Sequence, residues 1–180
     1  MTSAMPVADD AAFRGALGRF ASGVTVVTTV TGGVHHAMTA SAFTSVSLDP
    51  PQVLVCSDRS SRFHDAVVES GVWGISILTE AGERVSARFA RKGRPLDSQF
   101  DGVPYRTGEL GVPLLDGALA WLECRTRAVH DGGDHSILLG DVVAAGTADV
   151  EDAPLVYYRS HYARLVRSST SETSYDKGER

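Results

Sequence analysis

The chain has 180 residues, which is enough for one domain with a substantial hydrophobic core. Hydrophobic residues make up 43% and charged residues 22%, an ordinary composition for a soluble protein. The net charge of −5 argues against a nucleic-acid binder, and no apolar run approaches the roughly 20 residues that span a membrane. Residues 1–10 lack the basic start and apolar stretch of a signal peptide, so we expect a cytoplasmic protein.

The first predicted element is a helix over residues 10–21. Phe13, Leu17 and Phe20 recur at helical spacing and lie on one face of this segment. Residues 1–9, which precede it, are expected to be flexible.

A β-hairpin is predicted next. Residues 24–30 are almost wholly β-branched, which suits a strand. Gly32-Gly33 supplies the turn, because glycine adopts positive φ angles freely, and residues 34–39 form the return strand. We expect His35 and His36 to be exposed, since they come directly after the turn.

The middle of the chain is predicted to alternate short strands with short helices. The expected strands cover residues 43–48, 53–56 and 72–78. The expected helices cover residues 62–69 and 80–90. Ser60 or Ser61 can cap the first of these helices, and Gly71 can end it.

A long loop and a second hairpin are predicted for the last third of the chain. Residues 91–113 are rich in glycine, proline and charge, as in functional loops. Strands are expected over 119–129 and 135–148, on either side of a turn at 131–133. The polar residues 167–180 are expected to be disordered. Hairpins without regular βαβ alternation predict a mainly β barrel or sandwich with a few helices outside it.

The common catalytic and metal-binding signatures are absent. There is no dinucleotide-binding glycine fingerprint, no phosphate-binding loop of the NTPase type, no His-Glu-x-x-His and no Gly-x-Ser-x-Gly. Cys56 and Cys124 lack the spacing of a zinc site and are interpreted as buried free thiols. His130 and His135 flank a tight turn, which rarely lets two such side chains converge on a metal, so no metal is expected.

Two hydroxyl-rich loops are candidates for a ligand site. Residues 39–47 carry five hydroxyl groups, and residues 57–62 follow a strand and open a helix. Free N–H groups, serines and arginines at a helix start suit a phosphate. An ordinary serine cap beside solvated arginines explains the second loop equally well.

Taken in order, several segments resemble the short-chain flavin reductase family. Members of this family are FMN-binding split barrels that act as reductase components of two-component flavin monooxygenases. The matching segments are 20–29, 39–51, 89–90, 113–117, 133–135, Gly140 and 157–159. The resemblance implies a mainly β split barrel of Greek-key type, with a few peripheral helices, over residues 10–166.

The same resemblance implies an activity. An NAD(P)H:flavin oxidoreductase would reduce FMN or FAD with NADH or NADPH as co-substrate. It would supply the reduced flavin to a partner monooxygenase and work as a homodimer, without nucleic acid or membrane. Two alternatives stay open: a flavoenzyme of the same fold that acts directly on an organic substrate, and a non-catalytic flavin- or haem-binding protein.

Site residues also follow from the resemblance. Residues 39–47 would line the isoalloxazine ring, and the loop at 57–61 would hold the ribityl phosphate. His135, in a Gly-Asp-His segment, would lie beside the nicotinamide as the catalytic candidate, although a histidine after a glycine turn is often merely solvent-exposed. The flavin-binding candidates are Thr39, Ala40, Ser41, Thr44, Ser45, Val46, Ser47, Cys56, Ser57, Arg59, Ser60, Ser61, Phe89, Ala90, Arg91, Tyr158 and Arg159.

Overall fold

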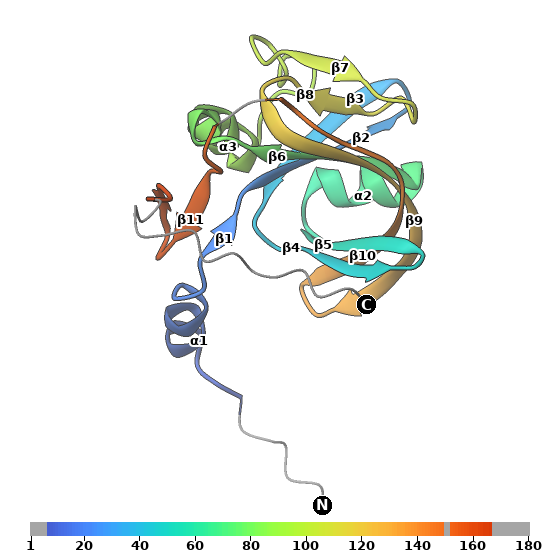
Figure 1. Cartoon of the computed structure of the whole chain (residues 1–180). Coiled ribbons are helices and arrows are strands. Elements are labelled where there is room, and N and C mark those ends of the chain that lie inside the picture. Colours follow the sequence, from blue (N-terminus) through green and yellow to red (C-terminus); the bar gives the residue numbers. More distant parts are fainter. Residues whose placement is uncertain (1–6, 150–151, 167–180) are drawn as a thin grey trace, which may run out of the picture.

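The computed structural model describes residues 7–149 and 152–166, and its centre is a seven-stranded sheet (Figure 1). The strand order is β3-β2-β6-β9-β10-β5-β4, and every neighbouring pair is antiparallel. The strands are β2 (Thr25–Thr31), β3 (Val34–Ala40), β4 (Phe43–Leu48), β5 (Pro51–Asp58), β6 (Val72–Leu78), β9 (Ala118–Gly132) and β10 (His135–Thr147). Figure 1 shows the sheet curving around helix α2 (Arg62–Ser70).

The two edge strands of this sheet are consecutive in the chain. Only Ser41 and Ala42 separate the end of β3 from the start of β4. The short connection therefore brings the two edges of the curved sheet together at one corner, which confirms the predicted mainly β barrel.

Smaller elements surround the barrel. They are α1 (Asp10–Leu17), β1 (Ser22–Gly23), a 3₁₀ turn η1 (Glu80–Gly82), α3 (Glu83–Ala90), β7 (Tyr105–Thr107), β8 (Pro113–Leu115), β11 (Val156–Tyr158) and β12 (His161–Ala163). Strands β1, β11 and β12 form one small sheet, and β7 pairs with β8. In the described part of the chain, no helix has the length and apolar character needed to cross a membrane.

The predicted first hairpin is confirmed as β2 and β3. Strand β2 is buried over its first five residues. Two of its threonines satisfy their buried hydroxyls on backbone carbonyls, since Thr25 Oγ1 donates to Ala40 O at 2.9 Å and Thr29 Oγ1 donates to Val72 O at 2.6 Å. These bonds explain how a threonine-rich strand can occupy the core of the sheet.

Helix α2 begins at Arg62 as predicted and ends at Ser70, one residue later than predicted, with the expected cap residues. Ser61 caps it, because its Oγ accepts a hydrogen bond from the His64 N–H at 3.2 Å. Gly71 ends it in the left-handed conformation, with φ of 66°. Phe63 and Val67 are buried on the face that contacts the sheet, whereas Arg59, Ser60 and Arg62 at the start of the helix are exposed.

Two hydrophobic clusters pack on opposite faces of β2. Val27 belongs to a cluster around Trp73 that includes α2. Its neighbour Val26 points the other way, into a cluster with Phe89 of α3 and Leu115 of β8. The second cluster holds α3 against the barrel and so positions the loop that follows α3.

Some predicted boundaries are wrong. Helix α1 ends at Leu17 rather than at residue 21, because the Gly18 carbonyl accepts a hydrogen bond from the Arg159 N–H at 2.9 Å and the chain continues into β1. The predicted helix over 80–90 is divided into η1 and α3. His36 is buried rather than exposed, since it lies where β3 faces α2 and α3. The predictions for residues 1–6 and 167–180 lie outside the described residues.

Candidate functional site

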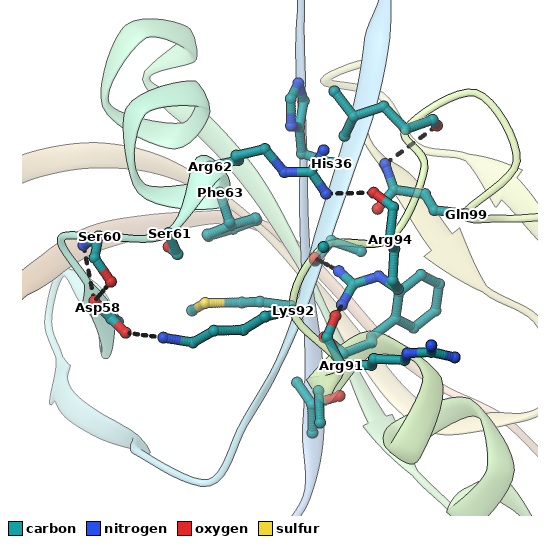
Figure 2. Close-up of a pocket in the computed structure, with 17 residues that line it drawn as sticks. His36, Asp58, Ser60, Ser61, Arg62, Phe63, Arg91, Lys92, Arg94 and Gln99 are labelled. Carbon is teal, nitrogen blue, oxygen red and sulfur yellow. Dashed lines mark hydrogen bonds and ion pairs between the residues drawn. The ribbon is translucent and has the colours of Figure 1, made fainter.

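A cavity of about 250 Å³, which we call the α2 cavity, lies at the start of helix α2 (Figure 2). Three segments surround it: residues 36–39 of β3, residues 58–63 at the start of α2, and residues 89–99 at the end of α3 and in the loop after it. The fold brings them together because α2 and α3 both pack against the β2–β3 hairpin.

One end of the α2 cavity is rich in hydrogen-bond donors. The first turn of α2 leaves backbone N–H groups without carbonyl acceptors in the helix. Ser60 donates to Asp58 Oδ1 through its N–H at 2.8 Å and its hydroxyl at 2.7 Å, and Lys92 Nζ lies 3.0 Å from Asp58 Oδ2. The hydrogen bond from the Ser60 hydroxyl, followed by that from Lys92, holds the pKa of Asp58 well below its usual range. Asp58 is therefore a carboxylate that orients Ser60 and Lys92 at this end.

Cations outnumber anions in the lining. Arg62, Arg91, Lys92 and Arg94 line the cavity, against the single carboxylate of Asp58. Within residues 7–149 and 152–166, neither Arg62 nor Arg91 nor Arg94 forms an ion pair with a carboxylate. A helix start together with unpaired guanidinium groups is a suitable site for a phosphate.

Arg94 is built into the wall of the cavity. Its Nη1 donates to Phe89 O and its Nη2 to Ala37 O, both at 2.7 Å, while its buried Nε has no hydrogen-bond partner among the described residues. Burial, and then the charges of Arg62 and Arg88, lower the pKa of Arg94. Arg94 therefore links the end of α3 to β3 and adds a partly buried positive charge.

The other walls are apolar or neutral. Phe63 and Phe89 are buried, with 4% and 2% of their surface exposed, and Met38 also lines the cavity. Burial, followed by the charge of Arg62, lowers the pKa of His36, so its imidazole is neutral at pH 7. The cavity thus combines a phosphate-compatible end with a wall that suits an aromatic ring.

Part of the predicted flavin site lies in this cavity. The residues that line it are Thr39, Ser60, Ser61, Phe89, Ala90 and Arg91. Their contact with a flavin stays a prediction. The others are outside the lining: Ala40, Ser41, Thr44, Ser45, Val46, Ser47, Cys56, Ser57, Arg59, Tyr158 and Arg159. Most of these belong to β4 and β5, which follow the corner where the barrel edges meet.

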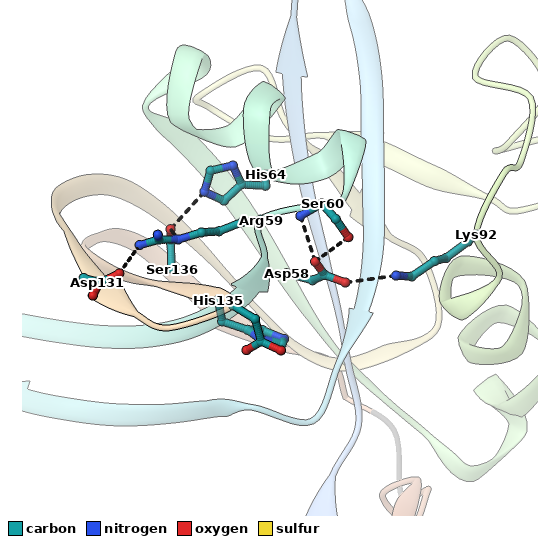
Figure 3. A network of polar contacts seen from close by, with 9 residues as sticks. Asp58, Arg59, Ser60, His64, Lys92, Asp131, His135 and Ser136 are labelled. Carbon is teal, nitrogen blue, oxygen red and sulfur yellow. Dashed lines mark hydrogen bonds and ion pairs between the residues drawn. The ribbon is translucent and has the colours of Figure 1, made fainter. Parts of the chain in front are cut away.

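Arg59 points toward the β9–β10 hairpin instead of into the cavity (Figure 3). Its Nε donates to Ser136 Oγ at 3.2 Å, and its Nη2 forms an ion pair with Asp131. His64 Nε2 lies 2.9 Å from the same Ser136 hydroxyl. These contacts fasten the hairpin to the start of α2, so Arg59 is a positioning residue in this structure.

His135 lies at the start of β10, directly opposite Asp58 of β5 in the strand register. Its side chain is half-exposed, and its Nδ1 lies 2.7 Å from Asp134 Oδ1. The hydrogen bond from His135, followed by its charge, lowers the pKa of Asp134. His135 is thus one strand away from the α2 cavity and does not line it.

Sequence reasoning missed several residues of the cavity. His36, Lys92, Arg94 and Gln99 line it but were not assigned to the site, and Arg62 was included only as part of the candidate phosphate loop at 57–62. The close spacing of basic residues from 88 to 94 was the available signal, because such a run beside a helix end can attract an anion. In the described residues, no group of three or more His, Cys, Asp or Glu side chains could hold a metal.

Comparisons with known proteins give the family of this chain. Residues 17–166 match the model described as "Flavin reductase like domain". The reductase subunit HsaB of a flavin-dependent monooxygenase from Mycobacterium tuberculosis is 38% identical over 164 residues, which cover 91% of this chain and 86% of that protein. The FMN reductase (NADH) SmoA of Agrobacterium fabrum is 42% identical over 155 residues, which cover 86% of each chain.

A solved structure agrees with these relatives. An NADH:FAD oxidoreductase of Streptomyces globisporus, in complex with NAD and FAD fragments, superposes with a TM-score of 0.84 and 34% identity. The alignment covers 93% of this chain and 100% of that one. The barrel, the α2 cavity and the matched sequence all lie within the same residues, and the chain therefore belongs to the flavin reductase like family.

Proposed function

We propose that this chain is an NAD(P)H:flavin oxidoreductase that reduces FMN or FAD and supplies the reduced flavin to a partner monooxygenase. The observation that carries the proposal is the α2 cavity, in which a helix start and arginines without a carboxylate partner in the described residues adjoin an aromatic wall. Relatives named as NADH-dependent flavin reductases and as a monooxygenase reductase subunit support it.

The residues of the cavity fit a flavin phosphate. The first turn of α2 supplies N–H donors, and Arg62 and Arg91 supply charge without a competing carboxylate partner in the described residues. When bound, a flavin supplies the redox chemistry, since its N5 accepts a hydride from nicotinamide C4. The chain itself would bind and orient the flavin, and the apolar wall formed by Phe63 and Phe89 would keep water from it. A hydride step needs no obligatory acid or base, which explains the absence of a catalytic triad in the sequence.

We infer that the site is completed by a second copy of the chain. A volume of about 250 Å³ is smaller than the ~300–1,000 Å³ of typical ligand pockets. Phe13 and Leu17 of α1, and Phe20 just after it, are exposed in the single chain, and Figure 1 shows α1 projecting from the barrel. A homodimer would cover such surface. Light scattering is expected to give twice the 19.1 kDa of one chain, and a monomer at micromolar concentration would contradict this.

The two cysteines support an inference about the cellular compartment of the protein. Cys56 and Cys124 are free thiols, as is usual in a reducing environment. We therefore infer a cytoplasmic protein, where NAD(P)H is also available.

The test of the function is oxidation of NADH or NADPH by the purified chain with FMN, FAD or riboflavin and no other substrate. We expect turnover that depends on added flavin. Absence of turnover would indicate a non-catalytic binding protein. Turnover only after addition of an organic substrate would indicate a flavoenzyme that acts on that substrate directly.

His135 is proposed to contact the nicotinamide. Its position opposite Asp58 sets it at the rim next to the α2 cavity, and half of its side chain is accessible. We expect His135→Ala to lower kcat/KM for NAD(P)H about five- to tenfold at saturating flavin, the effect of one lost hydrogen bond, with little change in flavin affinity. His130→Ala, exposed on the other strand of the hairpin, is the matched control. Equal kcat/KM in both variants and the wild type would make His135 an ordinary surface residue.

A further inference from the structure

A second cavity, of about 440 Å³, adjoins the α2 cavity and is lined mainly by arginines. Arg84 and Arg88 are spaced at i and i+4, so they lie on one face of α3, and Arg91 is the residue at which the helix ends. Arg94, in the loop after α3, completes a group that we call the arginine ledge. Arg91 and Arg94 line both cavities, so the ledge is continuous with the site of the proposed flavin phosphate.

The ledge carries an unusual charge for an acidic protein. Its cavity is lined by four arginines and no carboxylate. Within residues 7–149 and 152–166, none of the four forms an ion pair, whereas Arg59, Lys92 and Arg127 each have a carboxylate partner. No ion pair in the described residues offsets the repulsion among these guanidinium groups, and a bound anion would relieve it.

Two of the four arginines are held in place. Arg88 donates to Asp101 O and to Ser98 O, both at 2.7 Å, which fastens the loop to α3. Arg94 is fixed by carbonyls of α3 and β3, and in the part of the chain that the structure describes its buried Nε has no partner. A preformed pair of cations loses little side-chain entropy when an anion binds.

The other two arginines are free to reach a ligand. Arg84 and Arg91 are exposed, and in the described residues their side chains form no hydrogen bond or ion pair. Figure 2 shows Lys92 directed toward Asp58 while the neighbouring Arg91 points away from it. The ledge thus combines two arginines held by backbone carbonyls with two exposed arginines that have no partner in the described residues, which suits a group with several phosphate oxygens.

We propose that the arginine ledge binds the adenylate phosphate of FAD, so that this chain binds FAD more tightly than FMN. The inference rests on the proposed function, because it takes the shared flavin phosphate to be bound at the α2 cavity. The second phosphate of FAD is joined directly to the first, and Arg91 and Arg94 border both cavities at the point where it would lie. FMN ends at its single phosphate and leaves Arg84 and Arg88 without a ligand.

The test compares flavin affinities in variants of Arg84, which lines only the arginine cavity. Calorimetry on the wild type should give a Kd for FAD about tenfold or more below that for FMN. In Arg84→Gln the ratio of the FAD Kd to the FMN Kd should rise about tenfold, the effect of one lost charge-assisted contact, and in Arg84→Glu it should rise further. Arg125→Gln, which removes an exposed and unpaired arginine of β9, should leave the ratio unchanged.

Two results would overturn the proposal. One is equal affinity for FAD and FMN in the wild type, or a ratio that does not respond to Arg84→Glu. The other is a fall in kcat/KM for NADPH but not for NADH in Arg84→Glu, while the ratio of the FAD Kd to the FMN Kd stays at the wild-type value. That result would assign the ledge to the 2′-phosphate of NADPH. Oxidation of NADH with FMN by the wild type tests the reductase function separately, so failure of one proposal is distinguishable from failure of the other.

Discussion

FMN is expected to bind about a hundredfold more weakly to the Ser61→Asp variant than to the wild-type chain. Ser61 caps α2 and lines the α2 cavity at the end that we assign to the flavin phosphate. Aspartate caps a helix as well as serine does, so the fold should be retained. Two like charges about 4 Å apart repel by about 4 kcal/mol at an effective dielectric constant of about 20, and solvent screens part of this. The remaining repulsion corresponds to about two powers of ten in Kd, measured by fluorescence titration.

Two controls separate the effect of charge from that of structure. Ser61→Asn keeps the cap without adding charge, so its affinity for FMN should change by about threefold or less. Riboflavin has no phosphate and should bind the wild type and both variants equally. If riboflavin binding fell as much as FMN binding, or if the aspartate variant bound FMN normally, the phosphate would bind at another place on the chain.

The parts of the fold that sequence predicts well are those with local causes. Strands β2 and β3 follow from a β-branched run and a glycine turn, and α2 follows from Ser61 and Gly71 at its ends. The end of α1 has a distant cause, because Arg159 binds the Gly18 carbonyl. No local pattern near residue 18 indicates that contact, so the predicted helix ran too far.

The difference between local and distant causes also explains which of the predicted site residues line the cavity. Ser60 and Ser61 were predicted from the start of a helix and Phe89 from the family resemblance, and all three line the cavity. Arg59 has the same local signal but is paired with Asp131 of a hairpin far along the chain. His36 follows a turn, which favours exposure, yet the packing of β3 against two helices buries it. Side-chain direction at this site is therefore decided by tertiary contacts.

Trp73→Ala is expected to have the largest effect on stability, lowering the free energy of unfolding by about 3–5 kcal/mol. Trp73 has none of its surface exposed, and its Nε1 donates to Thr126 Oγ1 at 3.1 Å. It lies in the cluster that joins α2 to β6, β9 and β10, so its loss leaves a cavity beneath the elements that carry the site. Urea denaturation followed by circular dichroism measures the change, and Trp121→Ala, at a partly exposed tryptophan, should cost less.

The packing of Gly140 against Trp73 can be tested with a double variant. A Cβ at position 140 would lie 2.4 Å from Trp73 Cζ2 and 3.1 Å from Cys124 Cβ, so only glycine lets β10 approach the indole ring this closely. Gly140→Ala should therefore cost about 1–3 kcal/mol in the wild type by overpacking the core. In the Trp73→Ala background the added methyl enters the space that the indole has left, and the same substitution should cost little or stabilise. The double variant should then be more stable than the sum of the two single effects predicts, by about 1 kcal/mol or more. Additive losses would mean that the ring and the glycine do not pack against each other, and that a different contact sets the separation of β6 and β10.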